Sequence, residues 1–99
     1  MQIEETGIFS EWLESLRDVA GKARILQRID RLAHGNPGQH RVLTGGVREL
    51  KIDFGPGYRV YYTERGKKLV VLLAGGDKST QTRDILAAIA LAEKLKESK

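Results

Sequence analysis

The sequence predicts an α+β domain with two N-terminal helices, an antiparallel sheet of three to four strands and a C-terminal helix. Two runs with helical spacing come first, three short apolar segments joined by hairpin-length turns follow, and an amphipathic run closes the chain. At 99 residues the chain has room for one domain, residues 1–99. Hydrophobic residues make up 40% and charged residues 30%, which indicates a folded chain and not a disordered one.

The N-terminal part of the chain predicts a short strand and two helices. Residues 1–6 are compatible with an edge strand. Apolar side chains from Ile8 to Val19 have the spacing of one helical face, and Gly21 interrupts this pattern. A second helix with a basic outer face continues from Ala23 to Ala33. The Gly-Asn-Pro-Gly run at residues 35–38 ends it, because glycine supplies a left-handed cap and proline cannot continue a helix.

Three strands and a last helix complete the prediction. The strands cover residues 46–54, 57–64 and 68–75 and form a meander. The third strand is apolar on both of its faces, which predicts that helices cover it. Apolar side chains between Ile85 and Leu95 fall on one face of the C-terminal helix.

Charge and cysteine content narrow the classes of function. Seventeen Lys and Arg against thirteen Asp and Glu give a net charge of +4, which favours nucleic acid or an acidic protein as partner. The absence of cysteine excludes disulfides, thiolate catalysis and Cys-based zinc sites. The N-terminus is acidic where a signal peptide is basic, and the longest apolar run, Leu69–Ala74, is too short to span a bilayer. We therefore expect a cytoplasmic protein that does not contact a membrane.

Strand alternation indicates which side chains share a face of the sheet. Only a register that pairs odd with odd positions keeps the apolar sets of the first two strands together. If paired positions sum to about 110, Lys51 lies opposite Arg59 and Glu49 lies opposite Tyr61. Two cations directly opposite each other are destabilising, so we expect an anion between them or a carboxylate beside them. The opposite face carries the side chains assigned to packing, which are Tyr58, Val60 and Tyr62.

This polar set has the composition of a phosphate-binding and RNA-cleaving site. Internal attack by a ribose 2′-hydroxyl needs in-line geometry, a base and charge stabilisation, and it needs no metal or other cofactor. Lys51, Arg59 and Lys78 are candidates for holding the phosphate, and Glu49 or a bound water for the base. Tyr61 is a candidate for stacking on a base. The alternative is that these are solvent-facing strand positions without a function.

Other residues that carry chemistry fit ordinary roles better. His34 and His40 flank a turn with no partner evident in the sequence, so we expect a surface role for both. Trp12 shares a helical face with apolar side chains and is expected in the core. We expect no metal site, because the available carboxylates form no ligand motif and lie among cations. Those carboxylates are Glu49, Asp53, Asp77 and Asp84.

Three motifs in residues 45–85 carry a resemblance to a known family. They are Arg48-Glu49-Leu50-Lys51, Gly57-Tyr58-Arg59-Val60-Tyr61-Tyr62 and Gly75-Gly76-Asp77-Lys78-Ser79. Together with the flanking helices they resemble the phage-derived addiction-module killer proteins, a HigB-like branch of the RelE/ParE toxin superfamily. The resemblance implies a toxin of a type II toxin-antitoxin system that cleaves messenger RNA on the ribosome. It also implies a co-encoded antitoxin, usually a helix-turn-helix protein, through which the complex binds operator DNA.

The resemblance also assigns roles to individual residues. Arg59 matches the arginine of the Gly-Tyr-Arg motif that contacts the scissile phosphate, and Lys51 and Lys78 match basic residues of the family site. Glu49 stands where RelE itself has a lysine, so the base stays open. The tyrosine that RelE carries near its C-terminus falls near Asp84 here. Further RNA contacts are expected from Arg48, Tyr61 and Arg83.

Two other functions fit the same sequence. A ParE-like protein shares the fold but poisons DNA gyrase by binding, without a nuclease site. A non-catalytic domain that binds the antitoxin and co-regulates the operon is the second alternative.

Overall fold

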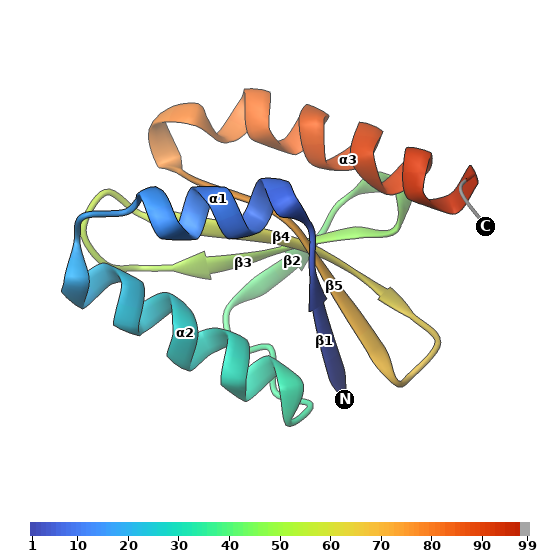
Figure 1. Ribbon diagram of the computed structural model, residues 1–99, viewed down its shortest axis with the longest axis horizontal. Helices are drawn as coiled ribbons and strands as arrows, with labels where there is room; N and C mark the ends of the chain where they lie inside the picture. The colour runs from blue at the N-terminus through green and yellow to red at the C-terminus, as the bar shows by residue number, and fades with distance from the viewer. Residues whose placement is uncertain (98–99) are drawn as a thin grey trace.

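A five-stranded sheet lies between a pair of helices and a third helix in the computed structural model, which describes residues 1–97 (Figure 1). This confirms the predicted α+β class, with two N-terminal helices and one C-terminal helix. The helices are α1 Gly7–Ser15, α2 Val19–Ala33 and α3 Gln81–Glu97. The strands are β1 Gln2–Glu5, β2 His40–Val42, β3 Val47–Ile52, β4 Tyr58–Arg65 and β5 Leu69–Asp77. Short 3-10 turns, η1 Thr44–Gly46 and η2 Lys78–Thr80, precede β3 and α3.

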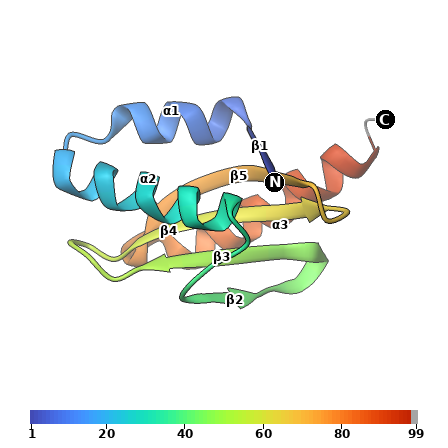
Figure 2. The ribbon, with the colours of Figure 1, turned by 90° about the horizontal axis from the view of Figure 1, so that it is seen from below.

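The sheet is larger than the expected three to four strands, and it is not purely antiparallel. Its order is β1-β5-β4-β3-β2, with β1 parallel to β5 and all other pairs antiparallel. Figure 2 shows β5, β4, β3 and β2 in this order. The expected edge strand in residues 1–6 is confirmed, and it joins through the Gln2 amide, which donates to the Lys68 carbonyl at 2.7 Å. Strand β2 was missed because three residues are too few to show an alternation.

The predicted register of the central hairpin is confirmed. Strands β3 and β4 pair so that Lys51 lies opposite Arg59 and Glu49 opposite Tyr61. The turn between them uses Gly55 and Gly57 at positive φ, which glycine adopts without strain. This register sends alternate side chains of both strands to opposite faces of the sheet.

The boundary between the first two helices differs from the prediction. Helix α1 ends at Ser15, and Val19 begins α2 instead of ending α1. Asp18 caps α2 by accepting a hydrogen bond from the Gly21 amide at 2.9 Å. Gly21 therefore lies inside α2, where its lack of a side chain leaves room for the ring of Tyr58. The sequence analysis interpreted Gly21 as an interruption of the helical pattern, whereas the structure has a close contact between α2 and Tyr58 at this position.

The two faces of the sheet bury separate apolar clusters. Helices α1 and α2 cover one face, and Figure 1 shows α3 on the side of the sheet opposite α2. Tyr58, Val60 and Tyr62 lie in the α1–α2 cluster, as predicted, and Trp12 packs against it partly buried. The α3 cluster contains buried side chains from strands β3, β4 and β5 and from α3, which are Val47, Tyr61, Val71, Leu73, Ala74, Ala88 and Ala92.

The face that carries Arg59 is covered, not open to solvent. Arg59 is 5% exposed, Glu49 2% and Tyr61 0%. The interpretation of these three residues as solvent-facing strand positions is therefore wrong, because α3 lies across this face. None of the helices in residues 1–97 combines the length and the apolar character of a membrane span.

Candidate functional site

A hollow of about 420 Å³ opens on the α3 face at the ends of β2, β3 and β4, and we call it the cationic hollow. It is lined by Gln39, His40, Arg41, Glu49, Lys51, Arg59 and Gln81. Three of the four residues predicted as catalytic, Glu49, Lys51 and Arg59, therefore come together in one place. The lining holds three Lys or Arg side chains and one carboxylate, so an anion is its electrostatic complement.

Arg59 is held in place by the turn that precedes it. Its Nη1 donates to the carbonyl oxygens of Gly57 at 2.9 Å and Tyr58 at 3.2 Å. Its Nε is buried and has no acceptor among the described residues. A buried donor without a partner is costly, and a phosphate oxygen in the hollow is the kind of acceptor that would satisfy it.

Lys51 faces Arg59 across the β3–β4 pair, and its backbone is fixed on both sides. The Lys51 amide donates to the Gln39 carbonyl at 3.0 Å. The Lys51 carbonyl accepts from Arg28 Nη1 at 2.6 Å. Two directly opposed cations repel each other, and an anion bound between them would relieve this repulsion.

Glu49 joins three elements at the floor of the hollow. One carboxylate oxygen accepts from Arg41 Nε on β2 at 2.9 Å, and the other accepts from Gln81 Nε2 on α3 at 2.9 Å. The carboxylate is almost fully buried, whereas Arg41 is half-exposed. These two bonds orient the Glu49 side chain beside Lys51 and Arg59.

Tyr61 lies beneath α3 and not in the lining of the hollow. Its ring is fully buried, so no RNA base can stack on it in this arrangement. Burial first, and then the nearby Glu49 carboxylate, raise the pKa of the Tyr61 hydroxyl. That hydroxyl has no hydrogen-bond partner among the described residues. The expectation of a stacking contact rested on alternation alone, which does not show that a helix covers the face.

Lys78, in η2, and Arg83, in the first turn of α3, lie next to the cationic hollow. They line a shallower hollow of about 540 Å³ that shares Gln81 with the cationic hollow. Gly57 lies between Lys78 and Arg59. A Cβ added to Gly57 would be 3.4 Å from Lys78 Cβ and 3.3 Å from Arg59 Nη1. Arg83 is largely exposed and lies 3.6 Å from the Asp84 carboxylate.

Arg48 is on the opposite face of the sheet. It pairs with Tyr62, whose side chain belongs to the α1–α2 cluster, and its Nη1 lies 3.5 Å from the Glu64 carboxylate. His40 pairs with Leu50, so alternation turns its imidazole toward the same face, where Nδ1 lies 2.8 Å from the Gly38 carbonyl. His40 therefore lines the hollow with its backbone, because its side chain lies on the other face of the sheet.

The carboxylates considered for a metal site are dispersed. Asp77 accepts hydrogen bonds from the side chain and the backbone of Ser79, which hold its pKa below the usual range. Asp84 accepts from Thr80, and Glu49 from Arg41 and Gln81. Within residues 1–97 no three His, Asp or Glu side chains are grouped as metal ligands would be.

Gln39, Arg41 and Gln81 were missed by the sequence interpretation. The first two flank His40, and Arg41 lies opposite Glu49. A strand at residues 40–42 would have placed Arg41 on the face of Glu49. Gln39, two positions before Arg41, would share that face if the alternation is extended by one residue. No sequence signal marks Gln81, which reaches Glu49 only because α3 folds back across the sheet.

The fold and the hollow define a small, basic α+β protein with a cationic site on one face of its sheet. The chain belongs to the family of phage-derived Gp49-like proteins (DUF891), whose model matches residues 11–97. A protein of Haemophilus influenzae, described as uncharacterized, is 47% identical over 95 residues that cover 96% of each chain. Neither description names an activity.

Proposed function

We propose that this protein is the toxin of a type II toxin-antitoxin pair and cleaves messenger RNA on the ribosome. One observation carries the proposal: Arg59 is buried, opposes Lys51 and has an unpartnered Nε at a cationic hollow. Opposed cations repel each other, and the Glu49 carboxylate beside them is already bonded to Arg41 and Gln81, so a further anion between them is favoured. A phosphodiester fits this requirement, and the net charge of +4 favours RNA over an uncharged ligand.

Besides the RNA and this chain, the cleavage step needs only water. The ribose 2′-oxygen attacks the adjacent phosphorus while the bond from phosphorus to the 5′-oxygen breaks. Glu49 is the candidate base that takes the 2′-hydroxyl proton, and water protonates the leaving 5′-oxygen. Lys51 and Arg59 stabilise the charge on the phosphate oxygens as the bonds exchange, and Lys78 neutralises the neighbouring phosphate. The products are a 2′,3′-cyclic phosphate and a 5′-hydroxyl end.

The resemblance to the HigB-like branch of the RelE/ParE superfamily supports the remaining parts of the proposal. It supplies the ribosome as the place of action and the cytoplasm as the compartment. It also supplies a co-encoded antitoxin, of helix-turn-helix type, as the partner that neutralises the toxin and contacts operator DNA. Arg83 is largely exposed beside Lys78, which suits a contact with the RNA backbone outside the hollow.

One observation favours a second candidate, a binding domain without catalysis. Both carboxylate oxygens of Glu49 already accept hydrogen bonds, from Arg41 and Gln81. If these bonds persist when RNA binds, the Glu49 carboxylate stays bonded to Arg41 and Gln81, and the hollow holds a phosphate without cutting it.

Transcript ends mapped after induction of the unneutralised protein test the proposal. We expect new ends within translated messages, and a drop in cleavage of roughly a hundredfold in Lys51→Ala and Arg59→Gln. Lys67→Gln, which removes one charge from an exposed turn, is the matched control and should cleave normally. Thermal melts of each variant show whether the fold is kept.

The chemistry of the ends separates the alternatives. With purified protein and programmed ribosomes, 2′,3′-cyclic phosphate ends support 2′-hydroxyl attack. DNA damage signalling with intact messages would instead identify a gyrase poison. A complete lack of toxicity, in a chain that still binds its antitoxin, would identify the non-catalytic binding domain.

A further inference from the structure

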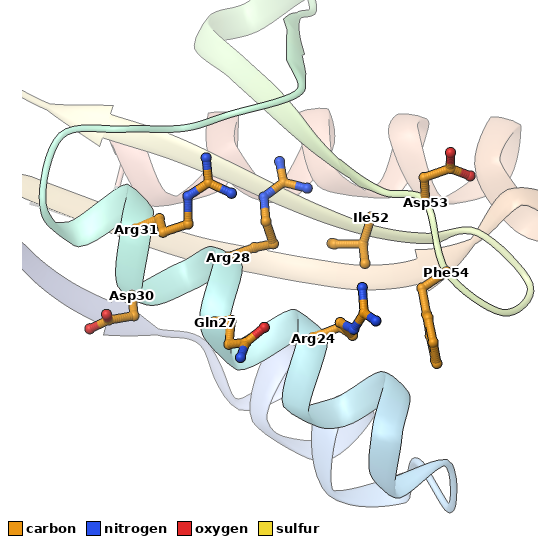
Figure 3. A pocket seen from close by; sticks show the side chains of 8 residues that line it. All are labelled: Arg24, Gln27, Arg28, Asp30, Arg31, Ile52, Asp53 and Phe54. Carbon is orange, nitrogen blue, oxygen red and sulfur yellow. The ribbon is translucent and has the colours of Figure 1, made fainter.

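A second hollow, of about 340 Å³, lies on the opposite face of the sheet between α2 and the end of β3, and we call it the α2 hollow (Figure 3). It is lined by Arg24, Gln27, Arg28, Arg31, Ile52 and Phe54 and by two carboxylates, Asp30 and Asp53. The three arginines follow one another at helical spacing, so they share a side of α2. Nothing in the proposed RNA chemistry uses this hollow.

The arginines of the α2 hollow have no carboxylate partner among the described residues. Figure 3 shows the Arg28 and Arg31 guanidinium groups side by side, while Asp30 points away from them. Burial, followed by the positive charge of Arg31, lowers the pKa of Arg28. Asp30 and Asp53 also line the hollow but form no ion pair with Arg28 or Arg31 in the described part of the chain, so these two adjacent guanidinium groups favour the binding of an anion.

Arg28 adds an unpartnered donor to the α2 hollow. Its Nη1 and Nη2 donate to carbonyl oxygens of Pro37, Gln39 and Lys51, but its Nε is buried without an acceptor among the described residues. The guanidinium is therefore fixed in direction while one of its N–H groups is unsatisfied. A carboxylate at this point would pair with Arg28 and Arg31 together.

The surroundings of the α2 hollow fit a protein better than a nucleic acid. The cations are arginines, and Arg24 stacks on Phe54 with its guanidinium carbon 4.7 Å from the ring centroid. Ile52 and Phe54 add apolar and aromatic surface to the same lining. Arginine, aromatic and apolar side chains together are typical of protein interfaces, whereas contacts to a nucleic-acid backbone come mainly from charged and polar groups.

We propose that the α2 hollow docks an acidic amphipathic segment of a partner protein. A carboxylate of this segment binds between Arg28 and Arg31, and an apolar side chain covers Phe54. The occupant is defined by charge complementarity to Arg28 and Arg31 and by the apolar surface of Ile52 and Phe54 in the same lining. The proposal does not depend on RNA cleavage, because the hollow lies on the face opposite Arg59.

An NMR titration of the intact protein with a short peptide of alternating glutamate and leucine tests the proposal. We expect amide shifts confined to α2 and residues 52–54, and binding weakened about tenfold in Arg31→Gln. Arg24→Gln should weaken binding less, because Arg24 is engaged with Phe54. Lys67→Gln is the charge-matched control and should bind as the unmodified protein does.

Three outcomes would overturn the proposal. They are no binding to the unmodified protein at millimolar peptide, equal binding of a peptide with glutamine in place of glutamate, and equal binding by Arg31→Gln. A single-stranded RNA octamer is titrated in parallel. If Arg31→Gln weakens binding of the RNA and not of the peptide, the hollow is a nucleic-acid site instead.

Discussion

Arg28 and Arg59 are similar in chemistry but differ in what their hydrogen bonds connect. Both have a buried Nε without an acceptor in the described part of the chain, and each belongs to a different face of the sheet. Arg28 donates to three carbonyl oxygens, nine, eleven and twenty-three positions away along the chain. Within residues 1–97, Arg59 donates only to the carbonyl oxygens of the two residues before it.

The sequence separation of these bonds indicates the role of each arginine. Bonds between distant segments hold α2, the loop after it and β3 together, so Arg28 contributes mainly to the free energy of unfolding. Bonds within one turn orient the side chain without joining segments, so Arg59 is available to the hollow it lines. We therefore expect the α2 face to respond to mutation chiefly in stability and the cationic hollow chiefly in activity.

Arg28→Met is expected to have the largest effect on stability. It removes three hydrogen bonds from a charged donor and leaves the Pro37 carbonyl without that partner. We expect the free energy of unfolding to fall by about 2 to 4 kcal/mol. Chemical denaturation measures it, with Arg59→Met as the matched variant, which should lose less than half as much. A greater loss in Arg59→Met would break the comparison between the two arginines.

Gly21→Ala sharpens the comparison by testing how closely α2 is packed. A Cβ at this position would lie 2.5 Å from both the Tyr58 ring and the Asp18 carboxylate. We expect a loss of about 1 to 3 kcal/mol in the free energy of unfolding, from overpacking. Gly7→Ala is the control, because a Cβ there meets nothing within 4 Å. An equal melting temperature for the two variants would show that α2 can shift without cost.

Tyr58 gives the α2 face a dependence on pH. Burial, followed by the hydrogen bond from its hydroxyl to Asp18, raises the pKa of Tyr58 to about 12 from the usual 10.0. A folded-state pKa above the unfolded value means that this contribution to stability is complete below pH 10 and is lost as pH rises toward about 12. Tyr58→Phe should lose about 1 kcal/mol at neutral pH.

The measurement is the free energy of unfolding across that alkaline range. Its decline should be shallower in Tyr58→Phe than in the unmodified protein, because one ionising group has been removed. Part of the decline should persist, since burial also raises the pKa of Tyr61 and Tyr62. An identical slope in both proteins would show that Tyr58 ionises as freely in the folded state as in the unfolded one.

The features that were predicted from the sequence are those set by local periodicity, such as the helices and the register of the central hairpin. Alternation in the central hairpin showed that odd positions pair with odd positions, and the short turn then gave the pairing of Lys51 with Arg59, which the structure confirms. It could not show that α3 covers the same face, since helix placement depends on long-range packing. Burial of Glu49 and Tyr61 follows from that placement and not from their own segments.

The parts that were missed depend on contacts between distant segments. Strand β2 exists by pairing with β3, and it brings Arg41 to Glu49. Gly21 was interpreted as a break because glycine has low helix propensity, but Tyr58, far along the chain, requires it. Lys78 was assigned both from its place after the third strand and from the resemblance, and the structure adds that Lys78 lies in η2 and Arg83 in the first turn of α3.

Arg83→Gln is expected to have the smallest effect and tests the boundary of the cationic site. The Arg83 side chain is 78% exposed, so its ion pair with Asp84 should contribute less than about 0.5 kcal/mol to stability. If Arg83 contacts the RNA backbone, its loss should lower the slope of log affinity against log salt by roughly 0.7. Cleavage at saturating RNA should not change.

Lys51→Gln provides the contrast for this last measurement, because Lys51 lies inside the hollow, opposite Arg59. It should lower the salt slope by a similar amount and should also lower the rate of cleavage at saturating RNA. Binding titrations and single-turnover cleavage at several salt concentrations separate the two effects. If both variants lower only the affinity for RNA, Lys51 binds RNA without assisting the bond exchange. Lys51 and Arg83 would then have the same role and would differ only in where they lie.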